Sequence, residues 1–314
     1  MNSRQNIIFR TTVIFIALIL ITIVYSQEQS YEKYIFAYKT IDGHDIKANI
    51  FLPVVNELHP VLVYFHGGFV FGNRDQGLPN SLKEKFLANN YAVVSADYRL
   101  APETKLNGML EDVKDVILWL REKGKKRYNI NPNRIVVAGG SAGGYLALTS
   151  GFRKKSSPNA IITISAPTGF TSASKMGDLT ILNQPGPYDV VKDTIISYGD
   201  YTKRMDLWRF LARNRLFQYE LFGFNPSKES DKLEKYKLQN SIDSNYPPTL
   251  IIHARNDRLV DLNQVNAFYE FLKEKNVITE LHLVENGHST ELINQNPDVV
   301  DKMIEFLTKQ LKEK

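Results

Sequence analysis

Residues 136–145 read Val-Val-Ala-Gly-Gly-Ser-Ala-Gly-Gly-Tyr, an apolar run that meets a cluster of small residues around Ser141. The apolar run is typical of a buried strand, and the small residues after it favour a helix that starts at once. Glycines at 139 and 143 allow the strand to reverse into that helix with little space between them. Such a turn forces Ser141 into a strained backbone conformation and leaves its hydroxyl group exposed. It also points the backbone amide of Ala142 toward the group that Ser141 attacks. The stretch therefore predicts a nucleophilic serine.

A serine hydroxyl is a poor nucleophile without a neighbouring base, and that base needs an acid to orient it. Of the six histidines, His288 alone lies in a loop immediately after a late strand-like run. Asp257 follows the preceding strand-like run. We therefore predict that Ser141, Asp257 and His288 act together, in that order along the chain. Asp261 and Glu285 are rival acids, although both are also explained as solvated loop charges.

A third motif, residues 64–69, reads Tyr-Phe-His-Gly-Gly-Phe at the end of an early apolar run. Paired glycines let backbone amides turn toward a developing oxyanion, and each such donor stabilises the transition state by about 2.7–4 kcal/mol. The expected donors are Gly67 and Gly68 together with Ala142. Gly68 and Phe69 are the alternative pair, and a simple strand-ending turn is the structural alternative.

Strand-like runs alternate with helix-like segments along most of the chain. A hairpin around Asp42-Gly43 comes first, and the later runs are continuous, as in strands covered on both faces. We predict strands at 34–38, 46–52, 61–65, 91–96, 134–138, 160–164, 249–252 and 281–284, and helices at 82–87, 109–120, from 141, at 263–274 and at 298–311. The alternation predicts parallel βαβ units in one doubly wound α/β sheet of about eight strands with helices on both faces. Gly124 is expected to end the helix that begins near 109.

Residues 168–245 interrupt this alternation. They contain no convincing strand, and residues 198–224 are rich in aromatic side chains. We interpret the segment as a helical insertion, which would form a cap if it lies over the carboxyl ends of the strands. The alternative is a helix whose aromatic side chains only pack on the sheet.

The first 26 residues have the three-part layout of a secretory signal. Arg4 and Arg10 precede an apolar core at 13–24, and small or moderate residues follow it. This core is shorter than the roughly 20 residues that span a bilayer. We therefore expect a cleaved signal peptide over 1–26 and a secreted or periplasmic domain over 27–314, with a retained membrane anchor or a buried helix as alternatives.

The composition excludes several other classes of protein. The 314 residues carry 39 Lys and Arg against 34 Asp and Glu, and no stretch concentrates the net charge of +5 as a nucleic-acid-binding surface would. The absence of Cys excludes disulfides, thiolate metal sites and a cysteine nucleophile. No H-E-x-x-H motif or phosphate-binding lysine accompanies the glycines, so we expect no metal and no cofactor. The sequence does not indicate an oligomeric state.

Taken together, the motifs resemble the α/β-hydrolase superfamily, and specifically its hormone-sensitive-lipase-like carboxylesterases and acetyl or feruloyl esterases. The resemblance covers Tyr31 to the C-terminus and rests on five features: His66-Gly67-Gly68, the string Asp-Tyr-Arg-Leu-Ala-Pro-Glu at 97–103 with Glu111-Asp112 after it, the glycine-rich turn at 139–144, Asp257 with Leu259-Val260, and Gly287-His288. Two positions depart from the family pattern. Phe69 replaces the usual third glycine, and Gly140 stands where many relatives carry Asp.

The resemblance implies a small-molecule ester as substrate and an acyl-enzyme intermediate on Ser141. His288 would act as base and then as acid, and Asp257 would orient it. The string at 97–103 would be a structural loop beside the oxyanion loop. The alternatives are a peptidase or amidase of the same fold and a non-catalytic binding protein.

Overall fold

The computed structural model describes residues 31–170, 177–178 and 197–311. The predicted signal at 1–26 lies outside this range, as do parts of the predicted insertion, namely residues 171–176 and 179–196. Within the described ranges, no helix combines the length and the apolar character needed to cross a bilayer.

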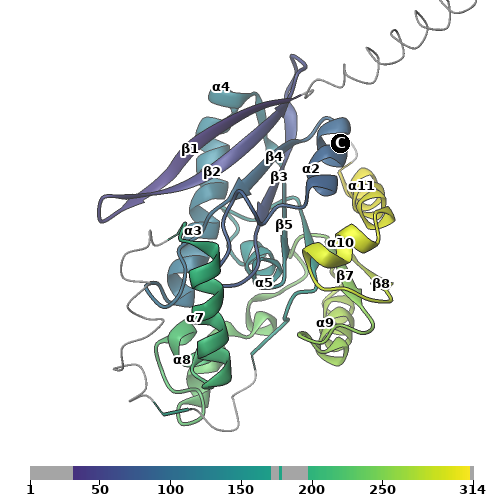
Figure 1. Cartoon of the computed structure of the whole chain (residues 1–314). Coiled ribbons are helices and arrows are strands. Elements are labelled where there is room, and N and C mark those ends of the chain that lie inside the picture. The colour runs from purple at the N-terminus through teal and green to yellow at the C-terminus, as the bar shows by residue number, and fades with distance from the viewer. Residues whose placement is uncertain (1–30, 171–176, 179–196, 312–314) are drawn as a thin grey trace, which may run out of the picture.

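An eight-stranded sheet forms the centre of the molecule, in the order β1-β2-β4-β3-β5-β6-β7-β8 (Figure 1). β1 and β2 form an antiparallel hairpin through Asp42 and Gly43, which both have positive φ. β2 is antiparallel to β4, and all other neighbours are parallel. The structure confirms each of the eight predicted strands, which are β1 Tyr31–Ile41, β2 His44–Pro53, β3 His59–Phe65, β4 Ala92–Ala96, β5 Ile130–Gly140, β6 Ala160–Ile164, β7 Thr249–Ala254 and β8 Thr279–Val284.

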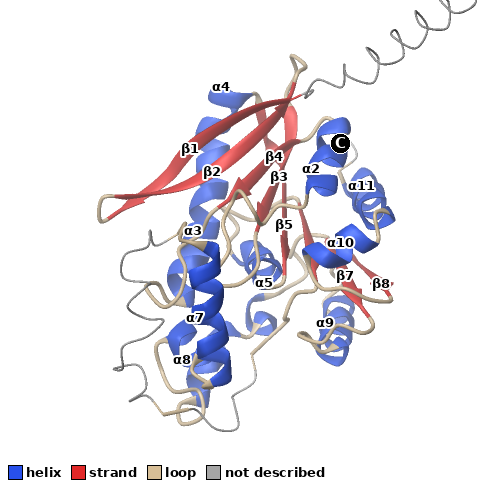
Figure 2. Cartoon of the chain, viewed as in Figure 1, coloured by secondary structure: helices blue, strands red, loops and turns tan. Residues whose placement is uncertain are grey.

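Helices cover both faces of the sheet, as predicted (Figure 2). The α-helices of the described ranges are α2 Asn80–Ala88, α3 Leu106–Trp119, α4 Lys125–Tyr128, α5 Ala142–Thr149, α9 Leu262–Glu274, α10 Thr290–Gln295 and α11 Asp298–Gln310, together with α7 Tyr201–Arg213 and α8 Phe217–Phe222 of the predicted insertion. Side chains of β3 alternate between two cores: Val63 belongs to the core that includes side chains of α3, α5 and α9, whereas Leu62 belongs to the core that includes side chains of α2, α10 and α11. Because the central strands are buried on both faces, their sequences are continuously apolar.

The predicted helix end at Gly124 is wrong. Residues Leu120–Gly124 form a π-helical turn that leads directly into α4, and the chain leaves the helix at Asn129 with a φ of 50°. A Cβ atom at position 124 would lie 3.1 Å from the Cβ atom of Ile130 in β5. Gly124 therefore allows the helix to approach the sheet closely, and Asn129 supplies the left-handed residue that ends it.

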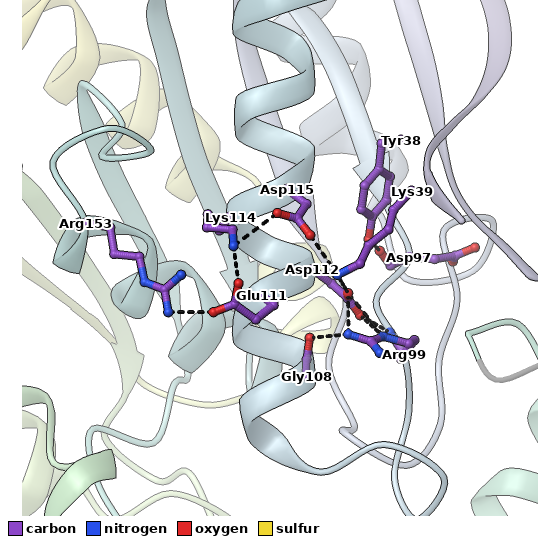
Figure 3. A network of polar contacts seen from close by, with 10 residues as sticks. All are labelled: Tyr38, Lys39, Asp97, Arg99, Gly108, Glu111, Asp112, Lys114, Asp115 and Arg153. Carbon is purple, nitrogen blue, oxygen red and sulfur yellow. Dashed lines mark hydrogen bonds and ion pairs between the residues drawn. The ribbon is translucent and has the colours of Figure 1, made fainter. Parts of the chain in front are cut away.

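A buried ion-pair network holds the 97–103 loop against α3 and β1 (Figure 3). The Asp112 carboxylate is fully buried and accepts hydrogen bonds from Arg99, at 2.8 Å from Nε, and from Lys39, at 2.9 Å from Nζ. Tyr38 in β1 donates to the backbone carbonyl of Asp97 at 2.6 Å. A buried carboxylate is tolerated only with such partners, so these bonds fix the start of the loop.

We predict that Asp112→Ala lowers the free energy of unfolding by about 3–5 kcal/mol, because it leaves Arg99 without its partner in a largely buried place. Lys302→Ala is the control, since it breaks an exposed pair with Glu305 and should cost less than about 1 kcal/mol. Urea denaturation followed by circular dichroism measures both. Equal losses in the two variants would contradict an anchoring role for Asp112.

Candidate active site

Ser141 lies on the predicted turn between β5 and α5, with φ 52° and ψ −120°. The glycines on either side of it permit close backbone contact. A Cβ atom on Gly139 would lie 2.2 Å from the carbonyl oxygen of Gly143, and one on Gly143 would lie 2.0 Å from the carbonyl oxygen of Phe65. The first turn of α5 therefore packs directly on the ends of β3 and β5, and this contact keeps Ser141 in a conformation that non-glycine residues rarely adopt.

His288 and Asp257 are directly paired. Nδ1 of His288 lies 2.7 Å from Oδ2 of Asp257, whose side chain is fully buried. The other oxygen of Asp257 accepts the backbone N–H groups of Leu259 at 2.8 Å and Val260 at 3.1 Å. An ionised carboxylate can only accept, so Nδ1 carries the shared proton, and in the neutral form of the ring Nε2 is the nitrogen with the lone pair.

The rival acids have other roles. Asp261 caps the start of α9, where its carboxylate accepts the N–H of Asn263 at 2.9 Å. Glu285 is exposed and accepts a hydrogen bond from Asn256 at 3.0 Å. The geometry thus favours Asp257 as the acid partner of His288.

The electrostatics of Asp257 balance burial against hydrogen bonding. Burial acts to raise the pKa of this carboxyl, but the hydrogen bond from His288 and those from the Leu259 and Val260 amides outweigh it, and the pKa lies below its usual value. Asp257 therefore stays ionised wherever His288 could serve as a base.

A second histidine lies near the same carboxylate, which the sequence did not suggest. Nε2 of His253, in β7, lies 4.0 Å from Oδ2 of Asp257 and 3.2 Å from the carbonyl oxygen of Val260. Burial lowers the pKa of His253, so its ring is neutral at neutral pH and donates to Val260. His253 therefore supports the loop that carries Asp257 without adding a charge beside it.

The glycine pair after β3 lies against the serine. A Cβ atom on Gly67 would lie 3.3 Å from the Cβ atom of Ser141, and Gly68 has a φ of 114°. Within the described part of the chain, the N–H groups of Gly67, Gly68 and Ala142 have no protein acceptor. The N–H of Phe69 instead points at the Tyr98 hydroxyl, 3.4 Å away. The geometry therefore favours Gly67 with Gly68 over the alternative pair.

The loop at 97–103 supports these glycines, in agreement with its expected structural role. The ring of Tyr98 stacks on that of His66 with centroids 4.4 Å apart, and its hydroxyl donates to the carbonyl of His66 at 3.0 Å. Burial lowers the pKa of His66 to about 4, so its ring is neutral, and Nδ1 lies 2.8 Å from the carbonyl oxygen of Gly67. Both rings therefore hold the backbone of the glycine pair.

A pocket of about 530 Å³ opens above Ser141 and His288. One wall comes from the loop after β3 and includes Phe71. Further lining comes from α7 and the start of α8 and includes Trp208, which packs edge-on against Phe71, and Phe217. None of the described lining residues is Asp, Glu, Lys or Arg. The pocket therefore suits an uncharged, partly apolar ligand.

Ion pairs join the helices of the insertion to the rest of the molecule. Arg204 in α7 is fully buried and donates to the carbonyl oxygens of Val70 at 3.0 Å and Ala101 at 3.3 Å, and it pairs with Glu103 at 2.5 Å. Lys105 pairs with Glu220 of α8 at 2.9 Å. The described part of 168–245 contains helical segments and no strand element, and the two helices lie together (Figure 1). Its role as a cap stays a prediction.

Arg204 was missed in the sequence because arginine is usually exposed. The available signal was its spacing from Leu207 and Leu211, which places all three on one helix face. Across the described ranges, no three Asp, Glu or His side chains come together in a way that could hold a metal ion.

Comparison with known proteins identifies a family and a fold. The family model BD-FAE matches residues 48–272. Esterase LipC of Mycobacterium tuberculosis is 26% identical over 245 residues, which cover 75% of this chain and 54% of LipC. The non-reducing polyketide synthase atr1 of Stereocaulon alpinum is 32% identical over 157 residues, which cover 46% of this chain but only 6% of the synthase.

Among solved structures, a truncated carbohydrate esterase from gut microbiota superposes with a TM-score of 0.69. The two chains are 19% identical, and the match covers 91% of this chain and 99% of that one. This likeness confirms the α/β-hydrolase fold that the sequence predicted.

We predict that Asp257→Asn destabilises the protein at neutral pH and that the deficit narrows in acid. A carboxyl whose folded-state pKa is lowered adds stability that is fully present above its unfolded pKa of about 3.9, and this stability is lost as the pH falls through the folded-state pKa. Urea titrations of wild type and variant between pH 7 and pH 3 measure the difference. A deficit that stays constant over this range would contradict the lowered pKa.

Proposed function

Since the chain belongs to the BD-FAE family, which is an α/β-hydrolase esterase family, we propose that it hydrolyses carboxylic esters through Ser141, His288 and Asp257. The observation that carries the proposal is the 2.7 Å bond from the buried Asp257 to His288, which lines the same pocket as Ser141. A base that is oriented by a buried acid and placed beside a strained, open serine is the arrangement that nucleophilic acyl transfer needs.

In the first half of the reaction, the Nε2 of His288 takes the proton from Ser141 while the serine oxygen attacks the ester carbonyl. Asp257 stays ionised and stabilises the imidazolium that forms. The imidazolium then gives its proton to the departing alkoxide oxygen, the carbon–oxygen bond breaks, and the alcohol leaves. The acyl group remains on Ser141.

In the second half, water replaces the alcohol. His288 removes a proton from the water molecule as its oxygen attacks the acyl carbon, and it then returns that proton to Ser141 as the acid is released. In both tetrahedral intermediates the negative oxygen needs donors. The free N–H groups of Gly67, Gly68 and Ala142 are proposed for this role, each at a stabilisation of about 2.7–4 kcal/mol.

The lining of the pocket supports an uncharged ester with an apolar acyl or alcohol group. Aromatic side chains on α7 pack against Phe71 on the loop after β3, with ring centroids 5.6 Å away for Tyr201 and 5.8 Å for Trp208, and a charged group placed on this lining would lose hydration without gaining a partner. The described helices of the insertion thus support the proposal that 168–245 forms a cap. The layout of residues 1–26 supports, on sequence alone, the further proposal that the enzyme is exported.

We predict that wild-type protein cleaves short p-nitrophenyl esters and reacts with a fluorophosphonate probe. Ser141→Ala or His288→Ala should lower kcat by about 10⁴-fold or more, because triad members act as a unit. Intact-mass spectrometry should show one phosphonyl adduct in the wild type and none in Ser141→Ala. Activity of Ser141→Ala within tenfold of wild type would refute the mechanism, and cleavage of anilides in preference to matched esters would favour an amidase.

We predict that Trp208→Ala changes kcat/KM unevenly across a series of acyl lengths, because pocket contacts are worth about 1–3 kcal/mol per methylene-sized difference. The chain has two tryptophans, and Trp119, stacked on Phe36 with centroids 4.1 Å apart, is the control. Trp119→Ala should lower the melting temperature and leave the acyl-length profile unchanged. An unchanged profile in Trp208→Ala would show that α7 only packs on the domain.

A further inference from the structure

Two serines share one unusual backbone conformation. Ser289, which follows His288 directly, has φ 54° and ψ −119°, and Ser141 has φ 52° and ψ −120°. Each residue immediately precedes a helix, α10 or α5. Non-glycine residues keep such angles only where the surrounding structure determines them. The environment of Ser289 is therefore as constrained as that of the proposed nucleophile, although it carries no expected chemistry.

Backbone N–H groups of both serines donate hydrogen bonds to residues at the carboxyl end of β6. The N–H of Ser141 donates to the carbonyl oxygen of Ile164 at 2.8 Å, and the N–H of Ser289 donates to Oγ of the next residue, Ser165, at 3.0 Å. Ser165 is fully buried, and its own N–H donates to the carbonyl oxygen of Ile252 in β7 at 2.9 Å. Ile164, the last residue of β6, and Ser165, which follows it, thus set the positions of Ser141 and Ser289.

The bond to Ser165 also orients His288. The N–H of Ser289 belongs to the same planar peptide unit as the carbonyl group of His288. A hydrogen bond that fixes this N–H therefore fixes the orientation of the whole peptide plane, which includes the Cα atom of His288. The pairing with Asp257 then sets the imidazole from its other end.

Gly140 provides the space that Ser289 occupies. A Cβ atom at position 140 would lie 2.1 Å from Oγ and 3.2 Å from Cβ of Ser289, and 3.0 Å from the Tyr64 hydroxyl. The first of these distances is far inside van der Waals contact. A side chain at 140 would therefore displace the Ser289 hydroxyl and crowd the Ser289 Cβ atom, and we expect this crowding to shift the peptide that links Ser289 to His288.

We propose that Ser165 and Ser289 are positioning residues that hold the His288 loop at a fixed distance from Ser141, and that glycine at position 140 of this chain leaves the space that the Ser289 side chain occupies. This inference rests on the proposed function, since it assigns a purpose to the distance between Ser141 and His288. Neither serine takes part in bond making. Each acts through the placement of His288.

The first experiment is a rescue. Gly140→Ala should lower kcat for a p-nitrophenyl ester by about 100-fold with little change in KM, because displacement by about 1 Å is enough for such a loss. Ser289→Ala alone keeps the N–H bond and should stay within about tenfold of wild type. The double variant Gly140→Ala with Ser289→Ala should recover most of the lost kcat, because the 2.1 Å contact is gone.

Tyr64 supplies the matched control. Gly140→Ala with Tyr64→Phe removes the other oxygen near position 140 but keeps Ser289, so kcat should remain as low as in Gly140→Ala alone. Rescue by Tyr64→Phe and not by Ser289→Ala would overturn the proposal. Wild-type kcat in Gly140→Ala would overturn it as well.

A second variant keeps the test decisive if Gly140→Ala does not fold. Ser165→Ala removes the acceptor of the Ser289 N–H without adding bulk, and it should lower kcat by about tenfold or more at nearly constant KM. Ser150→Ala is its control, because Ser150 is also buried and donates to the carbonyl oxygen of Ala147 at 2.6 Å, away from His288. Both variants should lose some thermal stability, but only Ser165→Ala should lose kcat.

Measurements on the wild type distinguish failure of the proposed function from failure of the positioning role. If it neither cleaves esters nor reacts with the fluorophosphonate probe, the proposed function fails. If it does both while Ser165→Ala and Ser150→Ala lose equal amounts of kcat, the function stands and the positioning role of Ser165 is refuted.

Discussion

The close backbone contact between α5 and the ends of β3 and β5 is the constraint on which the site depends. Because Gly143 has no side chain, the first turn of α5 reaches the Phe65 carbonyl, and Ser141 is held at positive φ between strand and helix. The same contact brings the glycine pair after β3 beside Ser141. A strand end, a helix start and a neighbouring loop thus supply the nucleophile and the proposed oxyanion donors without any long side chain.

The central strands were predictable because a strand that is buried on both faces of a sheet has a continuously apolar sequence. The turn at Ser141 was predictable because it requires a cluster of small residues. Helix ends were less predictable: Gly124 looked like a stop but serves close packing on Ile130. Arg204 and Ser289 were missed for another reason. Their importance lies in contacts with residues distant in sequence: the spacing of Arg204 from Leu207 and Leu211 indicates a buried helix face but not its partners, and Ser289 carries no local pattern that predicts its contacts.

The Asp, Glu, Lys and Arg side chains that form ion pairs lie outside the pocket, and none of the described residues that line the pocket is of these four types. The 97–103 loop contains one member of each of three pairs: Asp97 with Arg74, Arg99 with Asp112, and Glu103 with Arg204. Their partners lie after β3, in α3 and in α7. Charge-assisted hydrogen bonds therefore attach the loop to three other parts of the molecule. The ring of Tyr98, in the same loop, stacks on His66 next to the glycine pair.

The attachment of α7 through Arg204 limits how this protein could acquire a new substrate range. One guanidinium joins the helix to the carbonyl of Val70, a few residues beyond the glycine pair, so a shift of the helix would disturb the backbone that is proposed to bind the oxyanion. A change of specificity that moved the helix would therefore impair the proposed binding of the oxyanion. Divergence by exchanging side chains that face the pocket, such as Tyr201, Met205 and Trp208, would leave the attachment intact. Directed evolution of new specificities should accordingly accumulate changes on that one face of α7 and spare its buried side.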